Sequence, residues 1–388
     1  MNVDYWPVGT SAPSVWPVTK VELATDIALD WMPTRPASSA SGVVDLLAEV
    51  IQEENVDGVD YWLAHPAVAG FERQWRGVTS FMMGVPFCIK VLRAMGYTWW
   101  APVSCFRHNL ATNKPFYWWS PFFPLSQCQV EHVSPPLSPL YPDYIAARAD
   151  PAGGYRIAFF EAKGTTRALH AAPCPINWHN QARSAELKHR GNTIATSQHV
   201  VVATRLDPDR VRSRTRKIQV RAWNNHDPEL KAPFDVIAEV VRLHYLGVCL
   251  RLGMKRTARA LALAPLRWGD DAEHSRLSEA LWDPSASFEE TGEAFKEETV
   301  ETPFRNSRDE RIHYPRRRGA CGSGPFAVRP GLASPAVWLI QFLIDGKTEA
   351  AANMIRDLPH KLAFLAEATN SDEHCYLRPD GVYSELGD

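Results

Sequence analysis

The sequence predicts an α/β fold in which helices flank a central mixed sheet and helical extensions lie toward both ends of the chain. First, 388 residues, 45% of them hydrophobic, are enough to form the core of one enlarged domain or of two. Second, stretches with apolar residues at helical spacing alternate with short β-branched or aromatic runs. Third, residues 155–163, YRIAFFEAK, are apolar on both faces, which is typical of a central strand covered from both sides.

The charge and cysteine content exclude several broad classes. Lys and Arg total 42 against 44 for Asp and Glu, so any attraction to nucleic acid must be local. The seven cysteines are scattered and contain no Cys-x-x-Cys pair, which favours reduced thiols over a disulfide scaffold or a structural zinc site. We therefore expect a cytoplasmic protein.

The sequence gives no sign of a membrane segment. Its first residues lack a basic start followed by an apolar stretch. The longest apolar run, AVWLIQFLI at residues 336–344, is too short to span a bilayer. We expect a soluble chain without a membrane partner.

The first third of the chain predicts an irregular arm followed by helices and a strand. Residues 1–40 are rich in Pro, Ser and Trp and show no sustained period, so we expect irregular structure there. Residues 42–55 have apolar positions at helical spacing, and residues 72–96 predict one or two helices that end at Gly96. Residues 97–106, YTWWAPVSCF, form a candidate strand.

The middle of the chain continues this alternation. After the strand at 155–163, residues 175–191 predict a helix that ends at Gly191. Two β-branched runs follow, at residues 194–206 and 217–223. The resulting order is helix, strand, strand, strand, helix, strand and strand.

The last part of the chain is predicted to be largely helical. Residues 236–263 have a helical pattern, and residues 287–325 are charged and punctuated by Gly and Pro, which favours a linker. Residues 334–346 and 348–369 predict C-terminal helices. The predicted segments are thus an arm and helix at 1–70, a core at 71–230, a helical extension at 231–286, a charged linker at 287–330 and a helical segment at 331–388.

The apolar strand predicted at residues 155–163 ends with two opposite charges, those of Glu161 and Lys163. Side chains alternate along a strand, so Glu161 and Lys163 project to one face and Ala162 to the other. If the chain folds as a hairpin about residues 150–154, with Asp150 opposite Gly154, then Asp143 lies opposite Glu161. A register slip of one residue would turn Asp143 to the other face.

Two carboxylates that face each other repel, so the arrangement favours a cation between them. Oxygen ligands from Asp143 and Glu161, the backbone carbonyl of Ala162 and waters suit Mg²⁺ or Mn²⁺. Such an ion lowers the pKa of a bound water and stabilises the anionic transition state of phosphodiester cleavage. Lys163 could orient that water or neutralise developing charge, and the alternative is a hairpin edge with a structural salt bridge.

These residues resemble the active-site signature of the PD-(D/E)xK, or restriction-endonuclease-like, nuclease superfamily. Pro142 and Asp143, followed by Glu161-Ala162-Lys163 at the end of an apolar strand, carry the resemblance over roughly residues 70–225. It implies a core of one helix, a three-stranded antiparallel meander, a crossover helix and a further strand. It also implies that Asp143 and Glu161 bind metal and that Lys163 assists the attacking water.

Two further site residues are expected from the same resemblance. Some members add a Gln early in the crossover helix, where Gln181 stands, and others add an acidic residue in the first core helix, for which Glu72 is the candidate. The alternative for Gln181 is a solvated or capping residue.

Residues 205–221 carry seven basic residues against two acidic ones. A phosphate-contacting loop beside the site would explain this charge, and a solvated hairpin loop is the alternative. The predicted nucleic-acid contacts are Arg205, Arg212, Arg214, Arg216 and Lys217.

The resemblance and the residues together predict a magnesium- or manganese-dependent endonuclease that hydrolyses DNA. Restriction of foreign DNA or antiviral (anti-phage) defence in bacteria is the role that the resemblance implies, either as a homodimer or in a complex with other defence subunits. Two alternatives stay open. One is a non-catalytic subunit that binds nucleic acid or serves in an assembly, and the other is a nuclease that acts on RNA.

Overall fold

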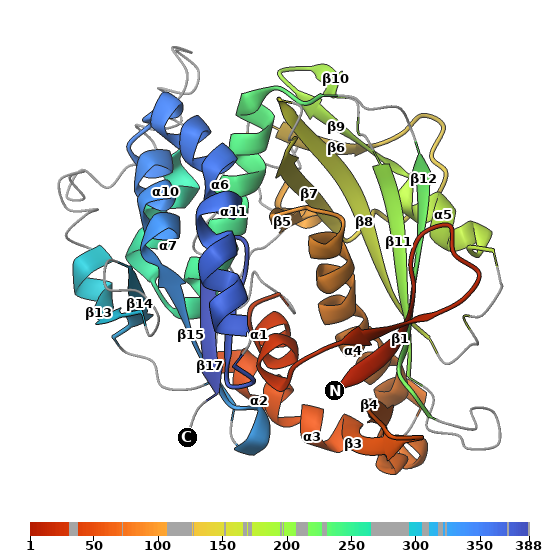
Figure 1. The fold of residues 1–388 in the computed structure, drawn as a ribbon. Helices are drawn as coiled ribbons and strands as arrows, with labels where there is room; N and C mark the ends of the chain where they lie inside the picture. The colour runs from red at the N-terminus through yellow and green to blue at the C-terminus, as the bar shows by residue number, and fades with distance from the viewer. Residues whose placement is uncertain are drawn as a thin grey trace.

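The computed structural model describes residues 1–30, 38–71, 73–106, 126, 128–150, 153–165, 169, 173–194, 196, 198–206, 216–226, 231–264, 295–304, 310–316, 321–322, 324–370 and 372–386. Over these residues the protein is a mixed α/β fold built around a large curled sheet. Figure 1 shows this sheet on one side of the molecule and the helices α6, α10 and α11 on the other, with α1 and α4 between them.

The large sheet has nine strands and mixed directions. Its order is β3-β4-β1-β12-β11-β8-β7-β5, and β2 pairs with β1 outside this order. Pairs β8 with β11, β12 with β1 and β1 with β4 are parallel, and the others are antiparallel. In that order the strands are Ile51–Val56, Val59–Ala64, Asn2–Trp6, Gln219–His226, Gln198–Arg205, Tyr155–Thr165, Tyr144–Ala149 and Trp99–Pro102, with β2 at Ser14–Pro17.

Strand β8 lies in the middle of this sheet and is covered on both faces, as its apolar sequence predicts. Ala158, Phe160 and Ala162 pack on one face against helix α4 (Arg73–Ala94). Ile157 and Phe159 pack on the other face, in the core that contains helix α6 (Phe234–Leu252). Each face removes apolar surface from water, and this burial holds the strand in the interior.

Helix α4 approaches the end of β8 unusually closely. A Cβ on Gly164 would lie 2.0 Å from the carbonyl oxygen of Ser80, so only glycine fits there. On the helix side, a Cβ on Gly84 would meet the backbone of Lys163 and Gly164 at 3.2 Å. These two glycines set the distance between helix and sheet directly behind the charged end of β8.

The remaining elements form two smaller sheets and the surrounding helices. The three-stranded sheet β10-β9-β6 is made by Asn192–Ile194, Ala185–His189 and Cys128–His132, and helix α5 (Ile176–Ala182) directly precedes β9. The five-stranded sheet β13-β14-β15-β17-β16 is made by Thr299–Pro303, Arg311–Pro315, Val328–Ala333, Val382–Leu386 and Cys375–Leu377. The other helices are α1 (Lys20–Asp30), α2 (Ser38–Asp45), α3 (Leu47–Val50), α7 (Lys255–Leu263), α10 (Ser334–Ile344) and α11 (Thr348–Asn370), with 3-10 turns at Pro66–Gly70, Val103–Phe106 and Gly324–Phe326.

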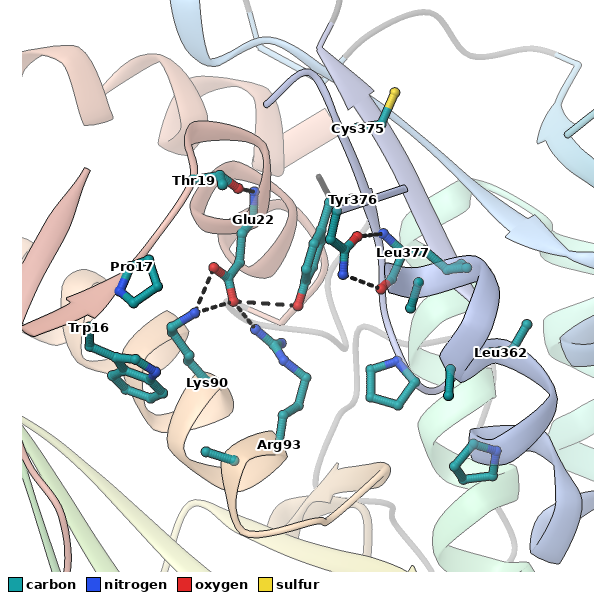
Figure 2. A pocket seen from close by; sticks show the side chains of 16 residues that line it. Trp16, Pro17, Thr19, Glu22, Lys90, Arg93, Leu362, Cys375, Tyr376 and Leu377 are labelled. Atoms are coloured by element: carbon teal, nitrogen blue, oxygen red, sulfur yellow. Dashed lines mark hydrogen bonds and ion pairs between the residues drawn. The ribbon is translucent and has the colours of Figure 1, made fainter. Parts of the chain in front are cut away.

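A buried ionic cluster joins α1 to α4. Glu22 accepts hydrogen bonds from Lys90 and Arg93, and Arg93 also binds Asp26 through both of its terminal nitrogens. The hydroxyl of Tyr376 points at the same Glu22 carboxylate, 3.4 Å away. Figure 2 shows Glu22, Lys90, Arg93 and Tyr376 on one side of a cavity of about 580 Å³, with Leu362 of α11 on the other side.

The C-terminal hairpin β16–β17 extends this cluster. Arg378 is fully buried and forms ion pairs with Asp30 at 2.8 Å and with Asp380 at 2.6 Å. His244 of α6 binds the same Asp380 carboxylate at 2.8 Å. Helices α1, α4 and α6 are therefore tied to the C-terminal hairpin through largely buried polar and charged groups.

The structure confirms the predicted elements around the charged strand. The helix expected at 72–96 is α4, and Gly96 has a positive φ of 83° just beyond its end. The strand expected at 97–106 is β5, followed by a 3-10 turn. The runs at 194–206 and 217–223 contain β11 and β12, and the helix at 236–263 is α6 followed by α7.

Elsewhere the structure corrects the sequence-based elements. Residues 1–40, expected to be irregular, contain β1, β2 and α1, and the second half of the helix expected at 42–55 is strand β3. The helix expected at 175–191 ends at Ala182, and β9 replaces its second half. The linker expected at 287–325 contains β13 and β14, and the C-terminal segment contains β15, β16 and β17 in addition to its helices. For β1 and β9, pairing with a strand distant in sequence prevails over local preference, whereas β3 pairs with the neighbouring strand β4.

One described helix is long and apolar enough to cross a membrane by length and composition. It is the part of α4 from Gly77 to Ala94, with a mean hydropathy of 1.2. In this fold 67% of that stretch is buried inside the protein, as expected of a core helix.

Candidate active site

The hairpin of β7 and β8 has the register that brings Asp143 to Glu161. The pairs run from Ala149 opposite Tyr155 to Tyr144 opposite Phe160. Asp143 is the next residue after this ladder, and its N–H donates to the carbonyl of Phe160 at 3.0 Å. The predicted register is confirmed over residues 144–149 and 155–160, and Asp143 lies just beyond this ladder, beside the end of β8.

The Asp143 side chain is held by the strand that it faces. Its Oδ2 accepts a hydrogen bond of 2.8 Å from the backbone N–H of Ala162. Burial raises the pKa of Asp143 to about 6, although this hydrogen bond, the Lys163 charge and a hydrogen bond with Glu161 oppose the increase. A carboxyl group with such a pKa would bind a proton or a cation near neutral pH.

Glu161 is the most deeply buried acid of the site, with 1% of its surface exposed. Its Oε1 forms a close ion pair with Lys163 Nζ, and hydrogen bonds from Lys163 and from the backbone N–H of Asp143 favour the ionised form. Burial and then the nearby Asp143 charge nevertheless raise the pKa of Glu161 well above its usual value. The neighbouring donors therefore compensate this carboxylate only in part.

Lys163 connects the two carboxylates to helix α5. Its ammonium donates to Gln181 Oε1 at 2.8 Å and pairs with Glu161 on the same face of β8. The Gln181 amide in turn donates to the carbonyl of Tyr141 at 2.9 Å, two residues before Asp143. Gln181 is 8% exposed, so it is a buried bridge between β8, α5 and the start of the hairpin.

The four predicted residues Asp143, Glu161, Lys163 and Gln181 therefore come together in one place. Oxygens from two carboxylates are ligands that a hard divalent cation accepts. The described residues hold no cluster of three or more His, Cys, Asp or Glu side chains, so a cation here would need backbone and water oxygens as well. Ala162 contributes its N–H to Asp143, and its carbonyl stays a predicted ligand.

The basic residues predicted to contact nucleic acid are partly engaged within the fold. Arg216 is 3% exposed and its guanidinium forms an ion pair of 2.9 Å with Glu54. Arg205 is buried and donates to Gln219, and the Lys217 ammonium lies 3.6 Å from the ring centre of Tyr61. Arg212 and Arg214 lie outside the described residues, as does Glu72.

Sequence reasoning missed residues that lie next to this site. Trp178 of α5 and Trp223 of β12 meet edge to face, with ring centres 6.3 Å apart, and Arg221 lies 5.4 Å from the Trp223 ring. Alternation along residues 217–223 could have placed Arg221 and Trp223 on one face. No sequence signal could have brought Trp178 to them, because that contact depends on the path of the chain after β8.

The cavity in Figure 2 is a poorer candidate for a catalytic site. Its charged groups Glu22, Lys90 and Arg93 are bonded to one another or to Asp26. These contacts lower the pKa of Glu22, which keeps its carboxylate ionised and compensated. Burial raises the pKa of Asp26 to about 6, but Arg93 donates to both of its carboxylate oxygens, so this set stabilises the packing of α1 on α4.

Comparison with known protein families, with curated proteins and with solved structures finds no match to this chain.

Proposed function

We propose that the protein is a divalent-metal-dependent nuclease that hydrolyses phosphodiester bonds in DNA, on a restriction-endonuclease-like core. The observation that carries the proposal is the meeting of the half-buried Asp143 with the buried Glu161 at the end of β8, where burial raises the pKa of both carboxyl groups. Two adjacent buried carboxylates are unfavourable without a proton or a cation between them. Because such an arrangement lowers the stability of the fold, it is found more often at functional sites than at purely structural ones.

The strand connections support the same proposal. Helix α4 is followed by the antiparallel strands β5, β7 and β8, then by α5 and by β11, which is parallel to β8. This is the order that the resemblance implies, with β6, β9 and β10 as additions. Asp143 directly precedes β7, Glu161 and Lys163 lie toward the end of β8, and Gln181 lies on α5. This distribution matches the one that the resemblance implies.

The residues present suit Mg²⁺ or Mn²⁺. Asp143 and Glu161 would hold the ion, together with the Ala162 carbonyl. A divalent cation supplies charge stabilisation for the phosphoryl transition state and lowers the pKa of a nearby water. Lys163, fixed by Gln181 at 2.8 Å, would orient the attacking water or offset charge that develops on the phosphate.

Digestion of plasmid and oligonucleotide DNA with Mg²⁺, with Mn²⁺ or with EDTA tests the proposal. We expect cleavage with either metal and none with EDTA. Glu161→Gln keeps the size of the side chain but removes its charge, so it should abolish cleavage. Glu131→Gln is the matched control, because Glu131 is 47% exposed and pairs with Lys188 at the surface.

The same experiment separates the two alternatives. DNA binding without metal-dependent cleavage of any substrate would indicate a non-catalytic binding or assembly subunit. Preferential cleavage of RNA in parallel digestions would indicate an RNA-directed nuclease.

Within the basic stretch at residues 205–221, we propose that Arg212 and Arg214 contact phosphates of the DNA. Arg216 is left out because its guanidinium is already paired with Glu54. Changing Arg212 and Arg214 together to Ala should weaken DNA binding and reduce its salt dependence by about two contacts. An unchanged salt dependence would favour the alternative that residues 205–221 form a solvated loop without contacts to DNA.

A further inference from the structure

A second group of side chains shares the sheet face that carries Glu161. Val201 of β11 pairs with Glu161, and Trp223 of β12 pairs with Val201. Paired residues project to the same face, and the even-numbered neighbours Val220 and Ala222 are buried in the core on the opposite face. Trp223 therefore lies two strands from Glu161, a separation of roughly 10 Å at the usual strand spacing.

Helix α5 contributes to the same group. Trp178 and Gln181 are three residues apart, so they project from the same side of the helix. Gln181 reaches Lys163 at 2.8 Å, while the ring of Trp178 lies 6.3 Å from that of Trp223. The helix thus spans from the proposed catalytic residues to the indole pair, and Figure 1 shows it beside β11 and β12.

Arg221 adds a cation to the indole pair. It pairs with Ala203, which in turn pairs with Lys163, so Arg221 and Lys163 lie in one row across the sheet. Its guanidinium lies 5.4 Å from the Trp223 ring and donates to the Leu169 carbonyl at 2.7 Å. A guanidinium has five N–H donors, so it can also contact a phosphate from this position.

We propose that Trp178 and Trp223 form a stacking site for an unpaired DNA base and that Arg221 binds the adjacent phosphate. Indole faces bind bases of any sequence by stacking, and arginine adds charge and cation–π attraction. Stacking requires a base whose face is free, which bases inside a duplex do not offer. The inference rests on the proposed nuclease function and names its substrate as single-stranded DNA or a frayed DNA end.

Trp178, Trp223 and Arg221 are each partly exposed, so a ligand can reach part of each side chain. A separation of roughly 10 Å from Glu161 would place the stacked base within one or two nucleotides of the cleaved phosphodiester.

Fluorescence anisotropy with a short fluorescein-labelled DNA strand, alone or as a blunt duplex, tests the inference in EDTA, where no cleavage occurs. We expect the full-length protein to bind the single strand more tightly than the duplex. Trp223→Ala should weaken single-strand binding by about 5- to 100-fold, the range of one lost stacking contact. Trp223→Phe should keep most of the affinity, and duplex binding should change little in either variant.

The matched control is Trp338→Ala, because Trp338 is 46% exposed on α10, far along the chain from the site. It should bind both DNA forms as the wild type does. Circular dichroism melting of each variant shows whether a loss of binding reflects unfolding, and Trp178→Ala provides a second substitution in the same site. Single-strand binding that survives both alanine substitutions, or a preference for the duplex or for an RNA strand of the same sequence, would overturn the inference.

The outcome is separable from that of the nuclease proposal. If the protein cleaves DNA with Mg²⁺ but Trp223→Ala does not weaken single-strand binding, the nuclease function is supported and the stacking site is excluded. If the protein binds single strands through these indoles but does not cleave them with Mg²⁺, the stacking site is supported and the nuclease function is excluded.

Discussion

The carboxylate of Asp143 is fixed by the backbone of Ala162, whose N–H donates to Oδ2 at 2.8 Å. This bond holds the acid beside Glu161 at the end of β8 and prevents it from turning to solvent. Two acids in contact in a buried place cannot both stay ionised without compensation. The arrangement therefore links protonation, metal binding and stability at one point of the fold.

The metal-free protein should lose stability as the pH rises. Burial raises the folded-state pKa of Asp143 from 3.8 to about 6, so the folded state keeps a proton that the unfolded state has released. The unfolding free energy then falls between pH of about 4 and about 6, by roughly 3 kcal/mol for Asp143 alone. Urea denaturation in EDTA across this range measures it.

The double variant Asp143→Asn, Glu161→Gln removes both groups and is the reference for other titrating residues. Its unfolding free energy should fall less with pH than that of the wild type, and saturating Mg²⁺ should stabilise only the wild type. Parallel pH profiles for the two proteins would contradict the proposed protonation.

Lys163→Ala should separate catalysis from stability. If the ammonium acts on the attacking water or on developing charge, cleavage falls by roughly two or more orders of magnitude while metal and DNA binding persist. If Lys163 only neutralises the carboxylates, the variant loses about 1 kcal/mol of stability and cleaves normally. Single-turnover cleavage and melting temperature, measured on one preparation, distinguish these results.

Lys188→Ala is the control for this substitution. Lys188 pairs with Glu131 and Glu186 on the small sheet, so its loss should leave both cleavage and stability close to wild type. A Lys163→Ala protein that is destabilised but fully active would rule out the catalytic role.

The hairpin and its charged end could be predicted because their information is local. Alternation along YRIAFFEAK places Glu161 and Lys163 on one face, and the short turn fixes which residue faces which. The Gln181 contact could be expected only from the resemblance. Its geometric cause, a helix that crosses above β8 and β11, is not visible in residues 175–191 alone.

Strands that pair over long distances could not be predicted in the same way. Residues 185–188, AELK, are all helix-favouring, yet Ala185, Leu187 and His189 are buried alternately because β9 lies between β6 and β10. Residues 2–6 become a strand by pairing in parallel with β12, more than 200 positions later. Local preference is weak compared with the burial that such pairing provides.

Gly164→Ala should destabilise the fold strongly. The new Cβ would lie 2.0 Å from the Ser80 carbonyl oxygen and 2.7 Å from the Phe81 nitrogen, and both are backbone atoms of α4. Relieving this overlap requires helix and strand to separate, so we expect a loss of about 3 kcal/mol or more in urea denaturation. The control Gly77→Ala meets nothing within 4 Å and should stabilise α4 by about 0.5 to 1 kcal/mol. A small loss of stability in Gly164→Ala would show that helix α4 and strand β8 can separate at little energetic cost.

Arg378→Met should cost far more stability than its single ion pairs suggest. The guanidinium is fully buried and lies 2.8 Å from Asp30, 2.6 Å from Asp380 and 3.6 Å from Asp26. Removing the cation leaves buried carboxylates that no water can solvate, which typically costs about 3 to 5 kcal/mol.

Arg256→Met provides the matched control, because Arg256 pairs with Glu297 at the surface and is 64% exposed. Its loss should cost less than about 1 kcal/mol. Chemical denaturation of both variants at neutral pH measures the difference. At low pH the carboxyl groups that Arg378 no longer pairs with should bind protons and lose their charge. Part of the stability lost in Arg378→Met should therefore be recovered at low pH. Equal losses for the two variants would show that the buried cluster is solvated or rearranges, and that it does not tie α1 to the C-terminal hairpin.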